Sequence, residues 1–244
     1  MTAAIRFHDV TLGYGRYPAV HHLSGEVARG SLTALVGPNG GGKSTLLKGI
    51  SGTLTPLDGR INVGAKSIAY LPQLAEIDRS FPISVFDLVS TGLWKKVGLF
   101  DRVGAAEKAR VARALARLGL SGFENRAIGT LSGGQMQRAL FARLLLQGAE
   151  LLLLDEPFAA IDERTVDDLI EIIRQWHEEG RTVLAVLHDF DLVRTHFPQS
   201  LLLAREPVAW GPTSEVLTAE NLGEARRRIE ASVPQAEFPA REAA

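Results

Sequence analysis

A glycine-rich segment early in this 244-residue chain joins a short apolar run to an amphipathic one. It comprises Gly37, Pro38, Asn39, Gly40, Gly41, Gly42, Lys43, Ser44 and Thr45, which match the pattern G-x-x-x-x-G-K-[ST]. Glycines in this pattern let the backbone curl so that several N–H groups point inward, and the following helix adds the positive end of its dipole. The plain alternative is a glycine-rich turn. Because a strand is expected before the segment and a helix after it, the pattern predicts a phosphate-binding loop, with Lys43 on the phosphates and the Ser44 hydroxyl on Mg²⁺.

Strand patterns and helix patterns alternate along most of the chain. Strands are expected at 5–12 (before a turn at 13–15), 31–36, 59–63, 67–71, 151–154, 182–187 and 201–203, and helices from about 43 and at 85–89, 105–118, 133–147 and 164–178. This alternation predicts a largely parallel sheet covered on both faces. The helical middle, about 74–148, is expected to be a subdomain inserted into one domain spanning 1–230. The remainder, 231–244, is expected to be a mobile tail.

Composition limits the partners that the chain can have. Lysine and arginine number 27 against 28 acidic residues, so the net charge is −1 and no basic field favours nucleic acid. The sequence has no cysteine, which excludes disulfides and thiolate metal sites. No signal peptide is expected at the amino terminus, and no run approaches the roughly 18 apolar residues that cross a bilayer. A membrane role would therefore need a partner.

A second motif places two carboxylates after a run of leucines. Asp155 and Glu156 directly follow the predicted strand 151–154. The leucines alone indicate only a core strand, but ligands of open α/β sheets bind at the carboxyl ends of parallel strands. We expect Asp155 to hold Mg²⁺ or its water, and Glu156 to be the general base that polarises an attacking water.

A third motif, at 131–135, combines a serine with two glycines before a predicted helix. Its residues after Leu131 are Ser132, Gly133, Gly134 and Gln135. A serine N-cap is the simple interpretation, but the glycines also leave backbone N–H groups bare at a positive helix end. Together, the three motifs resemble those of the ABC ATPase family, in family order, from Tyr14 to about His188.

This resemblance implies a fold and a mode of assembly. The fold is α/β, a P-loop NTPase (RecA-like) with a mixed, mostly parallel sheet core, an inserted helical subdomain and an N-terminal antiparallel β-subdomain. The assembly is a head-to-tail homodimer that binds ATP and Mg²⁺ at its interface. Each ATP would be held by the phosphate loop of one copy and by Ser132 and Gly134 of the other.

The resemblance also assigns roles outside the three motifs. Gln73 matches the family glutamine that touches Mg²⁺ and senses the transmembrane partner, and His188 the histidine that contacts the γ-phosphate and positions Glu156. Asp162 matches the loop that crosses to the other copy. Tyr14 is expected to stack on adenine, with Tyr17 as its rival.

The same resemblance points to transport. The family implies transmembrane permease subunits and a position at the cytoplasmic face of the membrane. The segments 70–92 and 187–193 are similar to those of ATPases of zinc- and manganese-type metal importers, which favours zinc as cargo and an extracytoplasmic metal-binding protein as an indirect partner. Importers of iron-siderophore, haem or cobalamin remain alternatives.

Two other classes of protein are less consistent with the sequence. ABC ATPases outside transport usually carry long coiled-coil insertions, zinc modules or a second cassette, and none is evident. A GTPase or RecA-like motor would lack the motif at 131–135, and no Asn-Lys-x-Asp motif occurs. The remaining histidines form no ligand cluster, and the run 226–228 is expected to be the solvated face of a terminal helix.

Overall fold

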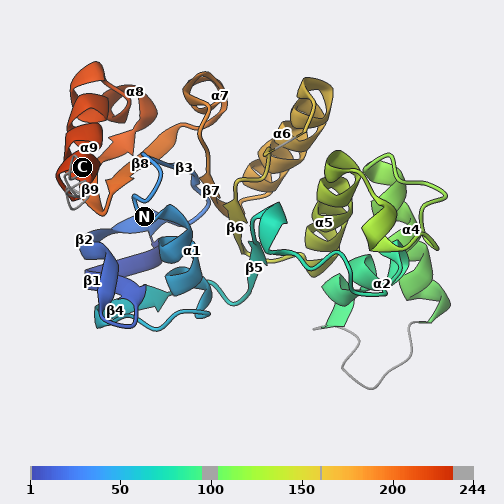
Figure 1. Cartoon of the computed structure of the whole chain (residues 1–244). Helices are drawn as coiled ribbons and strands as arrows, with labels where there is room; N and C mark the ends of the chain where they lie inside the picture. Colours follow the sequence, from blue (N-terminus) through green and yellow to red (C-terminus); the bar gives the residue numbers. More distant parts are fainter. Residues whose placement is uncertain (1, 95–103, 160, 233–244) are drawn as a thin grey trace, which may run out of the picture.

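The computed structural model describes residues 2–94, 104–159 and 161–232. Two sheets with the helices around them form one half of the molecule (Figure 1). The other half is formed by α2 (Val85–Ser90), α4 (Ala105–Arg117) and α5 (Gly133–Gln147). Strands β5 (Ile68–Leu71) and β6 (Leu151–Asp155) are the part of the larger sheet nearest the helical half, and the polypeptide leaves this sheet after β5 and returns to it at β6.

The smaller sheet is antiparallel, with strand order β2-β1-β4. Its strands are β1 (Ala3–Tyr14), β2 (Tyr17–Ala28) and β4 (Asp58–Val63). Apolar residues of β1 are buried in the core, as the early strand pattern predicts. This sheet is the N-terminal antiparallel β-subdomain that the family resemblance implied.

The larger sheet has six strands in the order β5-β6-β7-β3-β8-β9. They are β5 (Ile68–Leu71), β6 (Leu151–Asp155), β7 (Thr182–Val186), β3 (Leu32–Val36), β8 (Gln199–Ala204) and β9 (Glu206–Pro212). All neighbours pair in parallel except β8 and β9, which are antiparallel. The expected mostly parallel sheet is therefore confirmed, with one antiparallel strand at its edge.

Helices cover both faces of the larger sheet. The helices with described bounds are α1 (Lys43–Ser51), α2 (Val85–Ser90), α4 (Ala105–Arg117), α5 (Gly133–Gln147), α6 (Glu163–Glu178), α7 (Phe190–His196), α8 (Thr213–Val216) and α9 (Ala219–Ser232), with short 3₁₀ turns at Leu74–Glu76, Thr91–Leu93 and Ile128–Thr130. Of these, α2 and α4 lie in the helical half rather than on the sheet. On α4, Val111, Ala114 and Leu115 form a buried apolar stripe.

Alternate residues of the central strands face two separate cores. Leu151 and Leu153 pack with α1 and the antiparallel sheet, whereas Leu152 and Leu154 pack with α5 and α6. Because successive strand residues point to opposite faces, a strand that is buried on both sides needs a continuous apolar run. Helices α1 and α5 therefore lie on opposite faces of the larger sheet.

Several elements differ from the sequence-based expectation. Tyr14 is the last residue of β1 rather than part of a turn, because the hairpin turn is formed by Gly15 and Arg16 alone. Strands β2 and β9 and helix α7 were not anticipated. Helix α9 continues to Ser232, and the rest of the expected tail lies outside the described residues. Within the described ranges, no helix has the length and apolar character needed to span a membrane.

Candidate nucleotide-binding site

The glycine-rich loop connects the carboxyl end of β3 to the first residue of α1. Gly37 and Gly42 have φ angles of 144° and 90°, which side chains of L-residues rarely adopt. A Cβ on Gly37 would lie 2.0 Å from the carbonyl oxygen of Leu203, so the backbone approach itself requires glycine. Lys43 folds back over the loop, and its Nζ donates to the carbonyls of Gly37 and Pro38, both at 2.9 Å.

A pocket of about 430 Å³ opens over this loop. It is lined by Ala19, Asn39, Gly40, Gly41, Gly42, Lys43, Ser44, Thr45, Gln73 and Glu156. The structure thus brings most of the expected phosphate-loop residues to one cavity. The carboxylate of Glu156 and the amide of Gln73 line the same cavity from outside the loop. The N-terminal end of α1, with its bare N–H groups, borders the same cavity, which suits it to an anion.

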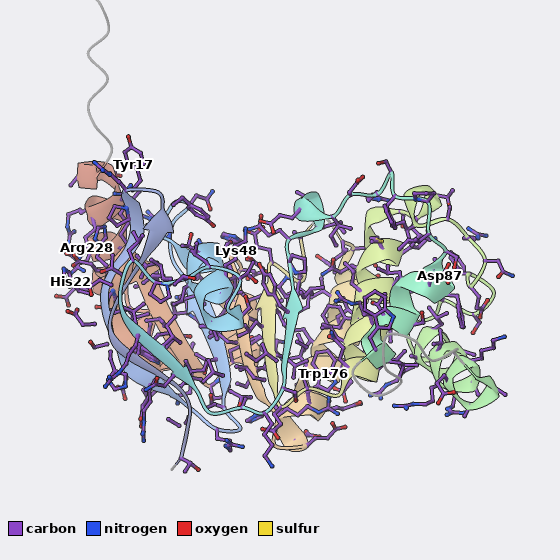
Figure 2. All side chains as sticks on the ribbon, turned by 90° about the horizontal axis from the view of Figure 1, so that it is seen from below. Tyr17, His22, Lys48, Asp87, Trp176 and Arg228 are labelled. Carbon is purple, nitrogen blue, oxygen red and sulfur yellow. The ribbon has the colours of Figure 1, made fainter. Side chains whose placement is uncertain are left out.

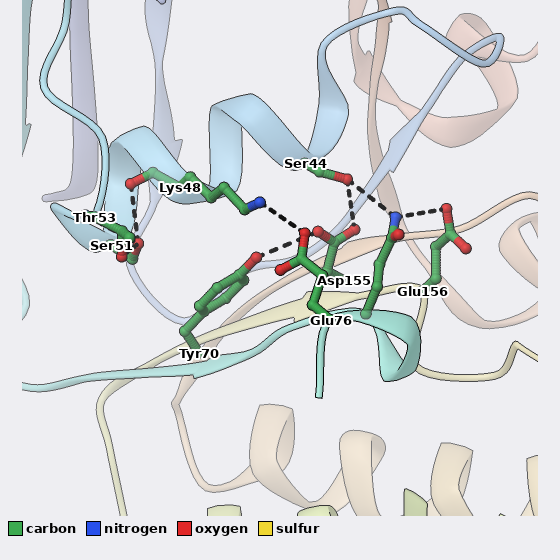
Figure 3. A network of polar contacts seen from close by, with 9 residues as sticks. Ser44, Lys48, Ser51, Thr53, Tyr70, Glu76, Asp155 and Glu156 are labelled. Atoms are coloured by element: carbon green, nitrogen blue, oxygen red, sulfur yellow. Dashed lines mark hydrogen bonds and ion pairs between the residues drawn. The ribbon is translucent and has the colours of Figure 1, made fainter. Parts of the chain in front are cut away.

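A polar network connects the loop to the ends of β5 and β6 (Figure 3). Ser44 Oγ donates to Asp155 Oδ1 at 3.0 Å and accepts from Gln73 Nε2 at 3.2 Å. Gln73 Nε2 also lies 3.0 Å from Glu156 Oε1. Residues from three distant segments of the sequence therefore meet at one edge of the sheet.

Glu156 occupies a strained position at this edge. Its φ of 48° is in the left-handed region, which is costly for a residue with a side chain and is found preferentially at functional sites. His188, which follows β7, places Nε2 2.8 Å from Glu156 Oε1. The carboxylate therefore has a histidine on one side and the Gln73 amide on the other.

Burial shapes the charges of the site. Burial lowers the pKa of Lys43, while Glu156 and Asp155 act in the opposite direction. Burial also raises the pKa of Asp155, and the hydrogen bond from Ser44 counteracts part of this effect. The negative charges of Asp155 and Glu156 therefore offset part of the cost of burying the Lys43 cation.

The serine-glycine turn lies elsewhere on the molecule. Ser132 caps α5 by accepting from Gln135 N at 3.2 Å, and Gln135 Oε1 accepts from Ser132 N at 2.9 Å. This reciprocal pair is a capping box. Ser132 is exposed, and none of the described residues of this turn lines the phosphate-loop pocket.

Asp162 lies beside that turn. It caps α6 by accepting from Thr165 N at 3.0 Å and from Thr165 Oγ1 at 2.8 Å, which lowers the pKa of Asp162. A Cβ on Gly134 would lie 3.9 Å from Asp162 Oδ2. Arg138 of α5 donates to Thr165 Oγ1 at 2.8 Å, so side chains link the turn to the segment after Glu156.

The two candidate tyrosines face each other across the β1–β2 hairpin. Tyr14 is 52% exposed and Tyr17 is 84% exposed, and neither lines the phosphate-loop pocket. Tyr17 lies at the outer edge of the molecule (Figure 2). The more sheltered position of Tyr14 favours it, and both remain candidates for stacking.

Sequence reasoning missed two contacts around this site. Tyr70 donates its hydroxyl to Asp155 Oδ2 at 3.4 Å, and burial raises the pKa of Tyr70. Lys48 of α1 forms a 2.7 Å ion pair with Glu76, three residues after Gln73 (Figure 3). The position of Tyr70 in the strand before Gln73 could have made it a candidate site residue. The Lys48–Glu76 pair could not have been predicted, because folding brings these two distant residues together.

Fold and site together define an α/β protein with a phosphate-binding loop at the carboxyl edge of a mostly parallel sheet. The chain belongs to the ABC transporter family, because residues 20–159 match the family model described as ABC transporter. Members hydrolyse ATP, so the chain is a nucleotide-binding ATPase of this family.

Relatives and solved structures agree with this assignment. The chain is 40% identical over 225 residues to the manganese transport system ATP-binding protein MntB of Listeria monocytogenes, covering 89% of this chain and 94% of that protein. It is 37% identical over 224 residues to the zinc transport system ATP-binding protein TroB of Treponema pallidum, covering 89% and 84%. An inward-facing metal-chelate type ABC transporter superposes with a TM-score of 0.82 at 29% identity, covering 93% of this chain and 90% of that chain.

Proposed function

We propose that this chain binds ATP with Mg²⁺ and, paired head-to-tail with a second copy, hydrolyses it to power import of a divalent metal ion. The proposal depends mainly on one observation, namely that the expected nucleotide-binding residues lie at two separate places on the chain. A network of Ser44, Gln73, Asp155 and Glu156 is assembled at the phosphate loop, while the turn at Ser132 is exposed away from it.

The residues at the loop fit a magnesium ion. Ser44, which lines the phosphate-loop pocket, and the buried Asp155 offer hard oxygen atoms 3.0 Å apart. The described residues contain no group of three His, Cys, Asp or Glu side chains that could hold a metal alone. Mg²⁺ usually takes one or two carboxylates, waters and substrate phosphates, so a single buried aspartate suits it. When bound, the ion would neutralise charge on the β- and γ-phosphates.

The protein's own groups would carry out the remaining chemistry. Lys43 would leave the Gly37 and Pro38 carbonyls to bind the β- and γ-phosphates. Glu156 would accept the proton of the attacking water, since it is the carboxylate that lines the pocket. His188 and Gln73, both bonded to Glu156 Oε1, would orient that base.

A second copy would complete the site. Ser132 and the N–H groups at Gly133 and Gly134 present hydrogen-bond donors at the positive end of a 15-residue helix, which suits a phosphate from another molecule. Contacts to the γ-phosphate from both copies would hold the pair closed, and hydrolysis would release it. Asp162, beside Gly134, would cross toward the other copy's nucleotide.

The proposed cargo comes from the relatives. Proteins named for manganese and for zinc transport are both similar to nearly the whole chain, so we propose a divalent ion of this class rather than zinc alone. We further propose transmembrane permease subunits that dock near Gln73 and the exposed Phe81, at the cytoplasmic face of the membrane. An extracytoplasmic metal-binding protein would deliver the ion.

The proposal is tested by uptake of radioactive manganese and zinc in cells that lack the gene. We expect uptake of at least one ion to fall and to be restored by the wild-type gene, but not by Glu156→Gln. Restoration by Glu156→Gln would contradict an ATP-driven role. Loss of iron-chelate uptake alone would instead support an importer of that class.

A further inference from the structure

A second pocket, of about 280 Å³, lies where the carboxyl-terminal parts of α4, α5 and α6 meet. Its lining residues are Arg110, Arg113, Ala114, Arg117, Leu145, Leu146, Trp176, Glu179 and Arg181. The loop 179–181 leads directly into β7, so this pocket is at the amino-terminal edge of the parallel sheet. The phosphate loop is at the opposite, carboxyl edge, and the two pockets share no lining residue.

The pocket is strongly basic. Arg110, Arg113 and Arg117 are spaced by three and four residues on α4, which places them on one side of the helix. Arg181 adds a fourth guanidinium from another segment. Like charges gathered in this way repel one another, and the chain as a whole has a net charge of only −1.

Few internal partners offset this charge within the described part of the chain. Glu179 is the acid among the lining residues, and Arg181 Nη2 already bonds it at 2.6 Å. Arg117 donates to Gln175 Oε1, a neutral group. Arg110 and Arg113 make no side-chain hydrogen bond or ion pair with described residues.

Two buried donors at this pocket also have no hydrogen-bond partner among the described residues. They are the indole Nε1 of Trp176, whose side chain is only 1% exposed, and Nη1 of Arg181. Trp176 stacks on Phe141 of α5 with ring centroids 5.7 Å apart, and it lies between the sheet and the helical half (Figure 2). A buried donor without an acceptor is costly and rare in folded proteins, so each such group calls for a specific explanation.

We propose that this pocket binds a phosphoryl anion. Guanidinium groups are planar and donate paired hydrogen bonds to phosphate oxygens, which makes arginine the preferred residue for this ligand. Such an anion would neutralise the α4 arginines that line the pocket. The site is independent of the nucleotide pocket and of the transport role.

The test uses the full chain labelled with ¹⁵N in its three tryptophans, titrated with pyrophosphate at constant ionic strength. We expect a saturable shift of the Trp176 indole signal, assigned with Trp176→Phe, and no comparable shift for Trp94 or Trp210. A matched titration with chloride should leave the Trp176 signal in place. No shift, or an equal shift with chloride, would overturn the proposal.

Variants test whether pyrophosphate binds at the proposed pocket. The double variant Arg110→Gln with Arg113→Gln should bind pyrophosphate at least about tenfold more weakly, since charge-assisted hydrogen bonds are lost. Arg226→Gln on α9, which removes the same charge from an exposed position, should bind as wild type does. Lys43→Ala should also keep the Trp176 shift. If the shift disappeared in this variant, pyrophosphate at the phosphate loop would be its cause.

A second experiment distinguishes the sources of the phosphoryl group. Cosedimentation with phosphatidylglycerol vesicles, but not with phosphatidylcholine vesicles, that depends on Arg110 and Arg113 would identify a lipid headgroup. A pyrophosphate shift without such cosedimentation would identify a soluble phosphate. Failure of both experiments would show that these arginines form only a solvated surface.

Discussion

The phosphate loop and the serine-glycine turn are both suited to a phosphate, yet they differ in how their polar groups are used. At the loop, Ser44, Gln73, Asp155, Glu156 and His188 already hydrogen-bond one another in the single chain. At the turn, the hydrogen bonds between Ser132 and Gln135 stay within the first turn of α5. The comparison teaches that the fold alone brings the polar groups of the phosphate loop together, so this half-site is prepared in the single chain. The serine-glycine turn is only exposed, which is why we propose that a second copy completes the site.

The sharpest expected effect comes from Glu156→Gln at the prepared half-site. This change keeps the shape but removes the proposed proton acceptor, so turnover should fall by about 10²–10⁴-fold. ATP binding should persist, and the ATP-bound pair should accumulate on size-exclusion chromatography. Turnover at the wild-type rate would show that Glu156 is not the base.

Substitutions at the two half-sites should separate binding from turnover. Lys43→Ala removes a cation from the phosphate-loop pocket, so the isolated chain should bind ATP more than about tenfold more weakly in calorimetry. Gly134→Asp should leave that affinity unchanged but lower turnover by at least about tenfold, because its charge would repel the other copy's phosphate. Gly134→Ala is the matched control, since a Cβ there meets only ordinary contacts. If Lys43→Ala and Gly134→Asp weakened ATP binding equally, the proposed difference between the two half-sites would be wrong.

A smaller effect should distinguish the two hairpin tyrosines. Stacking on a base contributes about 1–3 kcal/mol, so Tyr14→Ala should weaken ATP binding by about tenfold. Tyr17→Ala should leave affinity nearly unchanged, because this side chain is 84% exposed. Fluorescence titration of a labelled ATP analogue measures both variants, and the reverse ranking would assign the role to Tyr17.

The smallest effect concerns stability. Burial raises the pKa of Asp155, which means that its ionised form is unfavourable in the folded chain without ligands. Asp155→Asn should therefore stabilise the nucleotide-free protein and raise its Tm. Asp167→Asn, an exposed control, should shift Tm by less than that. A lower Tm for Asp155→Asn would contradict this view of the site.

Most of the fold could be predicted because local patterns determine it. The run of leucines at 151–154 predicts a buried strand, and the spacing of apolar residues on α4 predicts a helix with one buried side. The glycines of the phosphate loop indicate backbone angles that other residues rarely adopt. Strands β2 and β9 escaped prediction because most of their residues are exposed or half-exposed, which weakens the apolar pattern in the sequence.

Individual side chains of the site were predictable, but several of their contacts were not. The family resemblance made Gln73 and His188 candidates, yet their shared bond to Glu156 Oε1 depends on β5, β6 and β7 lying side by side. The Tyr70–Asp155 and Lys48–Glu76 contacts also join segments far apart in the sequence. Long-range pairing of this kind leaves no signal in local spacing.

The most direct test of the account is disulfide crosslinking between copies. Because the chain has no cysteine, Asn39→Cys in one tagged copy and Ser132→Cys in a differently tagged copy give an unambiguous pair. In a Glu156→Gln background we predict that oxidation links the two tags with ATP and Mg²⁺ present, and much less without nucleotide. Failure to link the tags under every nucleotide condition would contradict the claim that two copies share each ATP.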